Sequence, residues 1–198
     1  FFYYGEFIYE TGKSYLDSNE KSSIAAFAVN TGINYYIPVK LNPVISIQYA
    51  YATGDKDRTN YIDGNRPTDA TGDDKGFISF GTFSGGFALK PTLSNIQMFR
   101  GGASFTPFSQ VQSPFLKKMT ASAKYAYYMK AEKESRIKGG VAGEANKNIG
   151  QGIDLAFRWQ IFYDMSFYVN YGLFLPGKAY DDAEKNVNYI ESGFNFSI

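Results

Sequence analysis

The 198-residue sequence predicts an all-β fold, a transmembrane antiparallel up-and-down β-barrel with eight spanning strands in a single domain over residues 1–198. Three observations predict this fold class. Apolar and polar residues alternate with a period of two along most of the chain, as in strands with two different faces. The chain has 17 Tyr and 18 Phe, and aromatic residues favour strands. No uninterrupted apolar run approaches the ~18 residues of a transmembrane helix, whereas a membrane strand needs only ~9–11 residues.

The alternation gives each expected strand an apolar face and a polar face. Residues 44–53 show it most clearly, because Ile45 and Ile47 alternate there with Ser46 and Gln48. The expected strands are 1–11, 23–37, 44–53, 95–106, 118–130, 151–163, 167–175 and 190–198. Alternation over this length is a strong sequence signal for β-structure.

The connections between these strands alternate strictly in length. Those expected at 38–43, 107–117 and 163–165 are short or moderate, and those at 12–22, 54–94, 131–150 and 176–187 are long. Outer-membrane barrels sort their connections in this way, with tight turns on one side and long loops on the other. Residues 77–90 also contain strand-like pieces, but a ninth spanning strand would break the alternation. We therefore expect a structured excursion within the long 54–94 loop.

The polar face indicates which side of the sheet meets lipid. Arg100, Lys124, Asp154 and Arg158 lie in mid-strand among small residues, which is more typical of a lumen than of a densely charged, solvated exterior. Aromatic residues also collect at strand ends, as in the interfacial girdles of membrane barrels. Those near the short turns are Tyr35, Tyr36, Phe105, Phe108, Phe115, Phe162, Tyr163 and Phe167, and those toward the long loops are Tyr9, Tyr49, Tyr51, Tyr127 and Tyr180. An ordinary soluble β-core is the alternative interpretation.

The two ends of the sequence give information about the localisation of the protein. The chain begins with Phe1 and lacks a basic and apolar leader, so we expect a mature or partial chain. The last expected strand carries Phe194 and Phe196 in alternation, and it resembles the aromatic-bearing terminal strand of bacterial outer-membrane proteins. These features predict the outer membrane of a Gram-negative-type bacterium and contact with outer-membrane lipid.

Three stretches in register carry a family resemblance. YAYATGDKD at 49–57 is close to a Tyr-Ala-Ser-Gly-Asp strand end, GIDL at 152–155 to a Gly-x-Glu-x-Asp-Leu pattern, and GLFLPGKAY at 172–180 to a Phe-x-Pro-Gly-x-Ala ending. In these features the chain resembles the alginate export family of outer-membrane barrels. The resemblance implies a larger barrel of about 18 strands, of which these eight would be the C-terminal part. Thr53 replaces the family's Ser and the Glu before Asp154 is missing, so lumen roles do not carry over residue by residue.

If the family resemblance holds, the charges on the polar face govern which solutes pass. The candidate lumen or selectivity residues are Arg100, Lys124, Lys130, Asp154, Arg158 and Glu6, with Lys130 nearer the outer rim. Cationic side chains lower the barrier for anions, and guanidinium suits the carboxylates of a uronic-acid polymer. Asp154 shares a face with Arg158 and could pair with it, which would neutralise both charges. The sequence thus predicts an outer-membrane channel for hydrophilic, anionic solutes or polysaccharide.

The competing interpretation is a small eight-stranded barrel with a plugged lumen and a structural or adhesive role. Strand number separates the two, because eight strands leave an interior just filled by side chains. The oligomeric state is left open.

Composition excludes several other functions. The chain has no His and no Cys, which removes the common nucleophile pairs and thiolate chemistry, so we expect neither enzyme activity nor a cofactor. The net charge of +1 argues against a nucleic-acid partner. Asp55, Asp57 and Asp63 form a weak calcium candidate, because Asn60 and Arg66 stand where a calcium loop needs Gly and Glu. A solvated turn cluster is the favoured alternative, and no metal is expected.

Overall fold

The computed structural model describes residues 1–17, 20–56, 72–79, 81–135, 137, 144–180 and 185–197. The strands in this part of the chain are β1 (Phe2–Asp17), β2 (Glu20–Tyr36), β3 (Val44–Ala52), β4 (Ile96–Phe105), β5 (Met119–Met129), β6 (Asn148–Gln160), β7 (Met165–Pro176) and β8 (Val187–Phe196). A short 3-10 helix, η2 (Leu116–Lys118), precedes β5. The eight strands confirm the predicted all-β fold.

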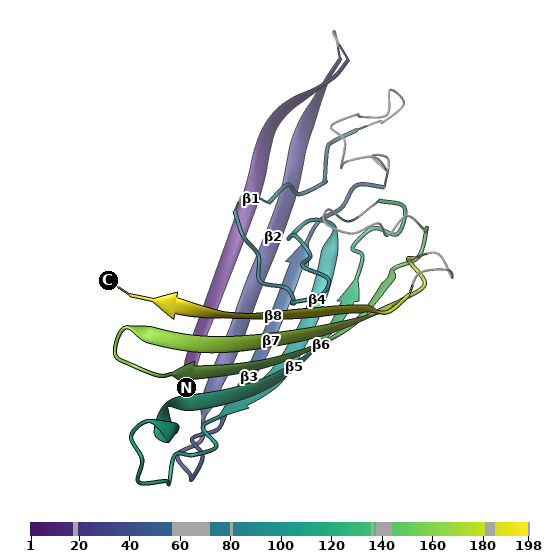
Figure 1. Ribbon diagram of the computed structural model, residues 1–198. Coiled ribbons are helices and arrows are strands. Elements are labelled where there is room, and N and C mark those ends of the chain that lie inside the picture. Colours follow the sequence, from purple (N-terminus) through teal and green to yellow (C-terminus); the bar gives the residue numbers. More distant parts are fainter. Residues whose placement is uncertain are drawn as a thin grey trace.

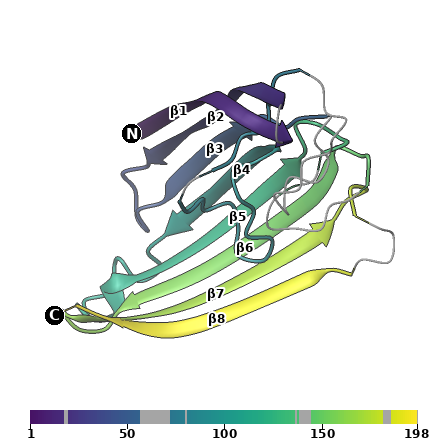
Figure 2. The same ribbon diagram turned by 90° about the horizontal axis from the view of Figure 1, so that it is seen from above.

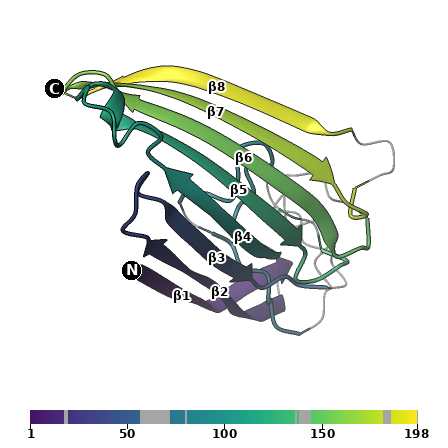
Figure 3. The same ribbon diagram turned by 90° about the horizontal axis from the view of Figure 1, so that it is seen from below.

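All eight strands belong to one antiparallel sheet, in which each strand pairs with its neighbours in sequence. The sheet curves into an open arch with β1 at one edge and β8 at the other (Figure 1, Figure 2). The view from below shows the same two separated edges (Figure 3). Within the described residues no ladder joins β1 to β8. The strands therefore have the up-and-down order of a barrel wall without closing on themselves.

The connection between β1 and β2 is much shorter than the sequence predicts. The predicted loop over 12–22 is wrong, because β1 continues to Asp17 and β2 begins at Glu20. Asp74, distant in sequence, forms an isolated bridge with β2, in which Ala25 N donates a hydrogen bond to Asp74 O at 2.8 Å. Residues 12–22 do not alternate in polarity, so the sequence pattern gave no sign that the two strands continue into them.

The two faces of the sheet differ as the alternation predicts. On the convex face large apolar side chains are open to the surroundings, with Phe7 67%, Ile47 64% and Ile190 76% exposed. On the concave face Ala28 and Ala52 are fully buried. The apolar face therefore points outward, which is the arrangement of a membrane barrel and the reverse of a soluble one. In the described part of the chain no helix has the length and apolar character needed to cross a membrane.

Most aromatic residues expected near the short turns are exposed at that end of the sheet. The exposed ones are Tyr35, Tyr36, Phe105, Phe108, Phe115, Phe162 and Tyr163. The placement of Tyr180 in the opposite girdle is wrong. Tyr180 is only 9% exposed and packs against Phe174, with ring centroids 5.6 Å apart. It follows Pro176 and Gly177 at the end of β7, and its ring packs inward rather than on the convex face.

Residues 72–79 and 81–95, called the inward loop below, cover part of the concave face. Phe77 and Leu93 of this loop are 1% and 6% exposed, and they join a buried cluster with Met98 and Tyr128 of the sheet. The described residues of 77–90 form no strand, which confirms the predicted excursion. The core of the molecule therefore lies between the arch and a loop folded beneath it.

Candidate functional site

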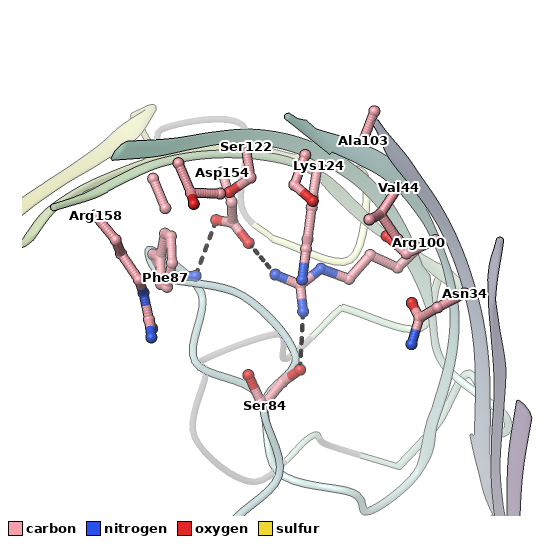
Figure 4. Close-up of a pocket in the computed structure, with 14 residues that line it drawn as sticks. Asn34, Val44, Ser84, Phe87, Arg100, Ala103, Ser122, Lys124, Asp154 and Arg158 are labelled. Atoms are coloured by element: carbon pink, nitrogen blue, oxygen red, sulfur yellow. Dashed lines mark hydrogen bonds and ion pairs between the residues drawn. The ribbon is translucent and has the colours of Figure 1, made fainter. Parts of the chain in front are cut away.

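A cavity of about 340 Å³ opens between the concave face and the inward loop (Figure 4). Four charged residues line it, namely Arg100, Lys124, Asp154 and Arg158. The uncharged polar lining comes from Asn34, Ser46, Ser84, Ser104, Thr120 and Ser122. The cavity thus presents hydroxyl and amide groups together with three cations and one carboxylate.

Strand register brings these charges together. Lys124 of β5 stands directly opposite Asp154 of β6, and Arg100 of β4 stands opposite Ala126, two residues farther along β5. All of them occupy alternate positions that face inward, because side chains of a strand point to opposite faces in turn. Arg158 lies four residues beyond Asp154, which is about 13 Å along the strand. Asp154 is therefore closer to the charges on neighbouring strands than to Arg158.

The ion pair at the cavity joins Asp154 to Arg100, and not to Arg158 as the sequence suggested. Arg100 Nη2 lies 2.6 Å from Asp154 Oδ2, and the two side chains are 8% and 6% exposed. Asp154 Oδ1 also accepts a hydrogen bond from Phe87 N at 2.9 Å. Arg100 Nη1 donates to Ser84 O at 3.0 Å. Both carboxylate oxygens of Asp154 and both terminal nitrogens of Arg100 are thus engaged by the protein, whereas Arg100 Nε is buried without a hydrogen-bond partner among the described residues.

The two remaining cations of the cavity are differently placed. Lys124 is half-buried and Arg158 is exposed, and both side chains point to the concave side of the sheet (Figure 4). Within the part of the chain that the structure describes, neither side chain forms a hydrogen bond or an ion pair with another residue. These two cations are therefore available to a solute.

Lys130 and Glu6, the other two candidates, lie away from this cavity. Lys130 is 1% exposed, and its Nζ donates to Glu144 O at 2.7 Å and to Lys133 O at 3.2 Å. It stabilises the connection after β5. Glu6 of β1 lines a second cavity of about 390 Å³ beside the inward loop, together with Phe77 and other residues. The structure thus gathers four of the six predicted site residues in one place.

Tyr128 is a site residue that sequence reasoning missed. Its hydroxyl donates to Gly85 O at 2.6 Å, and the side chain is 1% exposed. A Cβ added to Gly86 would lie 2.5 Å from the Tyr128 hydroxyl oxygen. Gly86 therefore permits a close approach of the loop backbone to the sheet. The glycine pair is the sequence signal that could have indicated this contact.

The calcium candidate is only partly visible. Asp55 is 5% exposed, and its Oδ2 accepts a hydrogen bond from Lys75 N at 2.8 Å. Asp57 and Asp63 lie outside the described residues. Among the residues that are described, no group of three or more His, Cys, Asp or Glu side chains could hold a metal ion. In the structure Asp55 fixes the start of the inward loop.

Each stretch that carries the family resemblance contains a glycine at a close approach. A Cβ on Gly54 would lie 2.0 Å from Asn95 Oδ1, and one on Gly152 would lie 3.0 Å from the Tyr128 ring. A Cβ on Gly172 would lie 2.7 Å from Ala88 N of the inward loop. The three stretches therefore surround the inward loop and the residues that support it.

An antiparallel arch with an apolar outer face and a charged inner face has the architecture of an outer-membrane barrel wall. A family model described as alginate export matches residues 1–190. The chain therefore belongs to the alginate export family, whose members are typically outer-membrane proteins of polysaccharide export. The comparison with curated proteins found no match.

Proposed function

We propose that this chain forms part of the wall of an outer-membrane channel that passes hydrophilic anionic solutes or an anionic polysaccharide. The observation that carries the proposal is the pair of cations, Lys124 and Arg158, in a cavity lined by hydroxyl groups. Neither cation has an internal partner within the described residues, so each can meet the carboxylate of a passing solute. The role is passive transport, without catalysis or a cofactor.

The lining chemistry suits a sugar acid better than a simple salt ion. Guanidinium binds carboxylate through two parallel hydrogen bonds, and Arg158 has this group free for such contact. Ser104, Thr120 and Ser122 offer donors and acceptors for sugar hydroxyls along the same wall. A uronic-acid polymer presents both groups on every residue, so it could exchange contacts while it moves.

The open sheet favours a large channel over a small plugged barrel. A closed eight-stranded barrel requires pairing between its first and last strands, and β1 and β8 do not pair within the described residues. We therefore propose that further strands complete the wall. The intact mass of the native protein checks this: a mass well above 22.1 kDa is expected, and a closed monomer of 22.1 kDa would support the plugged barrel instead.

Reversal potentials across planar bilayers test the anion preference. In a salt gradient the wild-type protein is expected to prefer anions, and Arg158→Ala and Lys124→Ala should each shift the reversal potential toward cation preference. Lys117→Ala is the matched control, because Lys117 is an exposed cation on η2 and does not line the cavity. Cation preference in the wild type, or an unchanged potential in Arg158→Ala, would contradict the proposal.

A further inference from the structure

Three adjacent strands hold the tip of the inward loop by its backbone. Arg100 of β4 donates to Ser84 O at 3.0 Å, and Tyr128 of β5 donates to Gly85 O at 2.6 Å. Asp154 of β6 accepts from Phe87 N at 2.9 Å (Figure 4). These contacts satisfy polar groups of a loop segment that has no strand partner of its own. The loop tip is thus attached to the sheet through side chains of the wall.

The three side chains are reserved for this attachment. Tyr128, Asp154 and Arg100 are 1%, 5% and 8% exposed. Both oxygens of Asp154 are occupied, one by Phe87 N and the other by Arg100 Nη2 at 2.6 Å. Both terminal nitrogens of Arg100 are likewise engaged by Ser84 O and Asp154. The two terminal nitrogens of Arg100 are therefore not free to bind a solute carboxylate in the cavity, although the sequence placed Arg100 among the selectivity cations.

The backbone of the loop tip also fits closely against the sheet. A Cβ on Gly86 would lie 2.5 Å from the Tyr128 hydroxyl oxygen, and one on Gly172 would lie 2.8 Å from Phe87 Cβ. Such distances leave no space for the loop to move toward the wall. The free cross-section of the cavity beside it is consequently set by where these contacts hold the tip.

We propose that Arg100, Tyr128 and Asp154 form a clamp that holds the inward loop as a fixed constriction. The clamp sets the size of solute that passes, whereas Lys124 and Arg158 select its charge. Asp154 is the positioning residue, since it orients Arg100 and holds Phe87 N at once. This inference rests on the proposed channel function and adds a division of labour within the same site.

Removal of one hydroxyl tests the clamp without a change of charge. Tyr128→Phe loses the bond to Gly85 O, so the loop tip should loosen and single-channel conductance should rise, by roughly twofold, with the reversal potential unchanged. Tyr125→Phe is the matched control, because Tyr125 lies on the same strand with its side chain on the convex face and is 48% exposed. The control should conduct as the wild type does.

A second variant removes the positioning residue. Asp154→Ala breaks the contacts to Phe87 N and Arg100, so it should raise conductance further and admit larger neutral polyethylene glycols into the pore. Migration of unheated protein in detergent gels would show that each variant is folded. If the wild type and both variants are folded and conduct, and both variants keep the wild-type conductance and size exclusion, the clamp proposal is overturned and the channel proposal stands. A wild type without conductance would overturn both proposals.

Discussion

Asn95 joins two connections at the outer end of β4. Its side-chain amide donates to Ser135 O at 2.9 Å and to Glu132 O at 3.1 Å, and its Oδ1 accepts from Glu132 N at 2.8 Å. The residue is 2% exposed and has a φ of 46°, a left-handed conformation that Asn tolerates better than most residues. One amide side chain thus fixes the connection after β5 against the end of the inward loop.

Replacement of Asn95 by Ala should destabilise the protein strongly. The expected loss exceeds that of Asn42→Ala by about 2–3 kcal/mol, since three hydrogen bonds of a buried side chain disappear at about 1 kcal/mol each. Asn42 is the matched control, because it also has a φ of 46° but is exposed, so Ala creates similar backbone strain there. Urea unfolding in lipid vesicles measures both. Equal losses would assign the effect to backbone strain alone.

At the scale of elements, the inward loop depends on small residues in the strand beneath it. Gly172 of β7 faces the loop, and a Cβ there would lie 2.7 Å from Ala88 N and 2.8 Å from Phe87 Cβ. Gly101 of β4 differs, because a Cβ there would meet only Ser46 O, at 4.0 Å. The same substitution at these two glycines therefore separates loop packing from general effects on a strand.

Gly172→Ala should push the inward loop away from the sheet. We expect a loss of about 1–3 kcal/mol in the free energy of unfolding, because the added methyl group overpacks the contact. Faster cleavage of the loop by added protease would accompany the loss. Gly101→Ala should stay close to the wild type in both measurements. A Gly172→Ala protein as stable and protease-resistant as the control would argue against tight loop packing.

Sequence alone predicted the strands and their faces, and the reason is physical. A two-residue period shows which side of a strand is apolar, so Ile45 and Ile47 indicated the apolar convex face directly. Contacts that depend on register were not predictable in this way. The partner of Asp154 is Arg100, 54 positions away, and the partner of Tyr128 is a backbone carbonyl 43 positions away. The hairpin beyond residue 12 was missed for a different reason, because residues 12–22 do not alternate in polarity.

At the scale of the whole molecule, the convex face defines how the protein meets its surroundings. Ile47 lies within β3 on that face and is 64% exposed, with Ile33 beside it on β2. Apolar side chains left open over an entire sheet match a hydrocarbon environment. Stability in a bilayer should therefore depend on the apolar character of this face and much less on that of the concave face.

Ile47→Lys should lower the free energy of unfolding in lipid vesicles by about 2–4 kcal/mol, because a cation near the bilayer centre is costly. Asn30→Lys should cost far less. Asn30 faces inward on β2 directly opposite Glu6, so the new charge would meet a carboxylate rather than lipid. Unfolding titrations of the two variants in the same vesicles make the comparison. A greater loss from Asn30→Lys would indicate that the faces are assigned the wrong way round.

The inward loop also has a mechanical consequence, since it touches both sides of the arch. Ile78 N donates to Glu10 on β1 at 3.0 Å, and Lys90 Nζ lies 3.9 Å from the centre of the Tyr189 ring on β8. The loop thus connects the two edge strands of the arch across its concave side, and these contacts resist both flattening and further bending of the sheet. A solute that displaces the loop would therefore also have to change the curvature of the sheet. In the proposed channel, the width of the passage would therefore depend on the stiffness of the sheet.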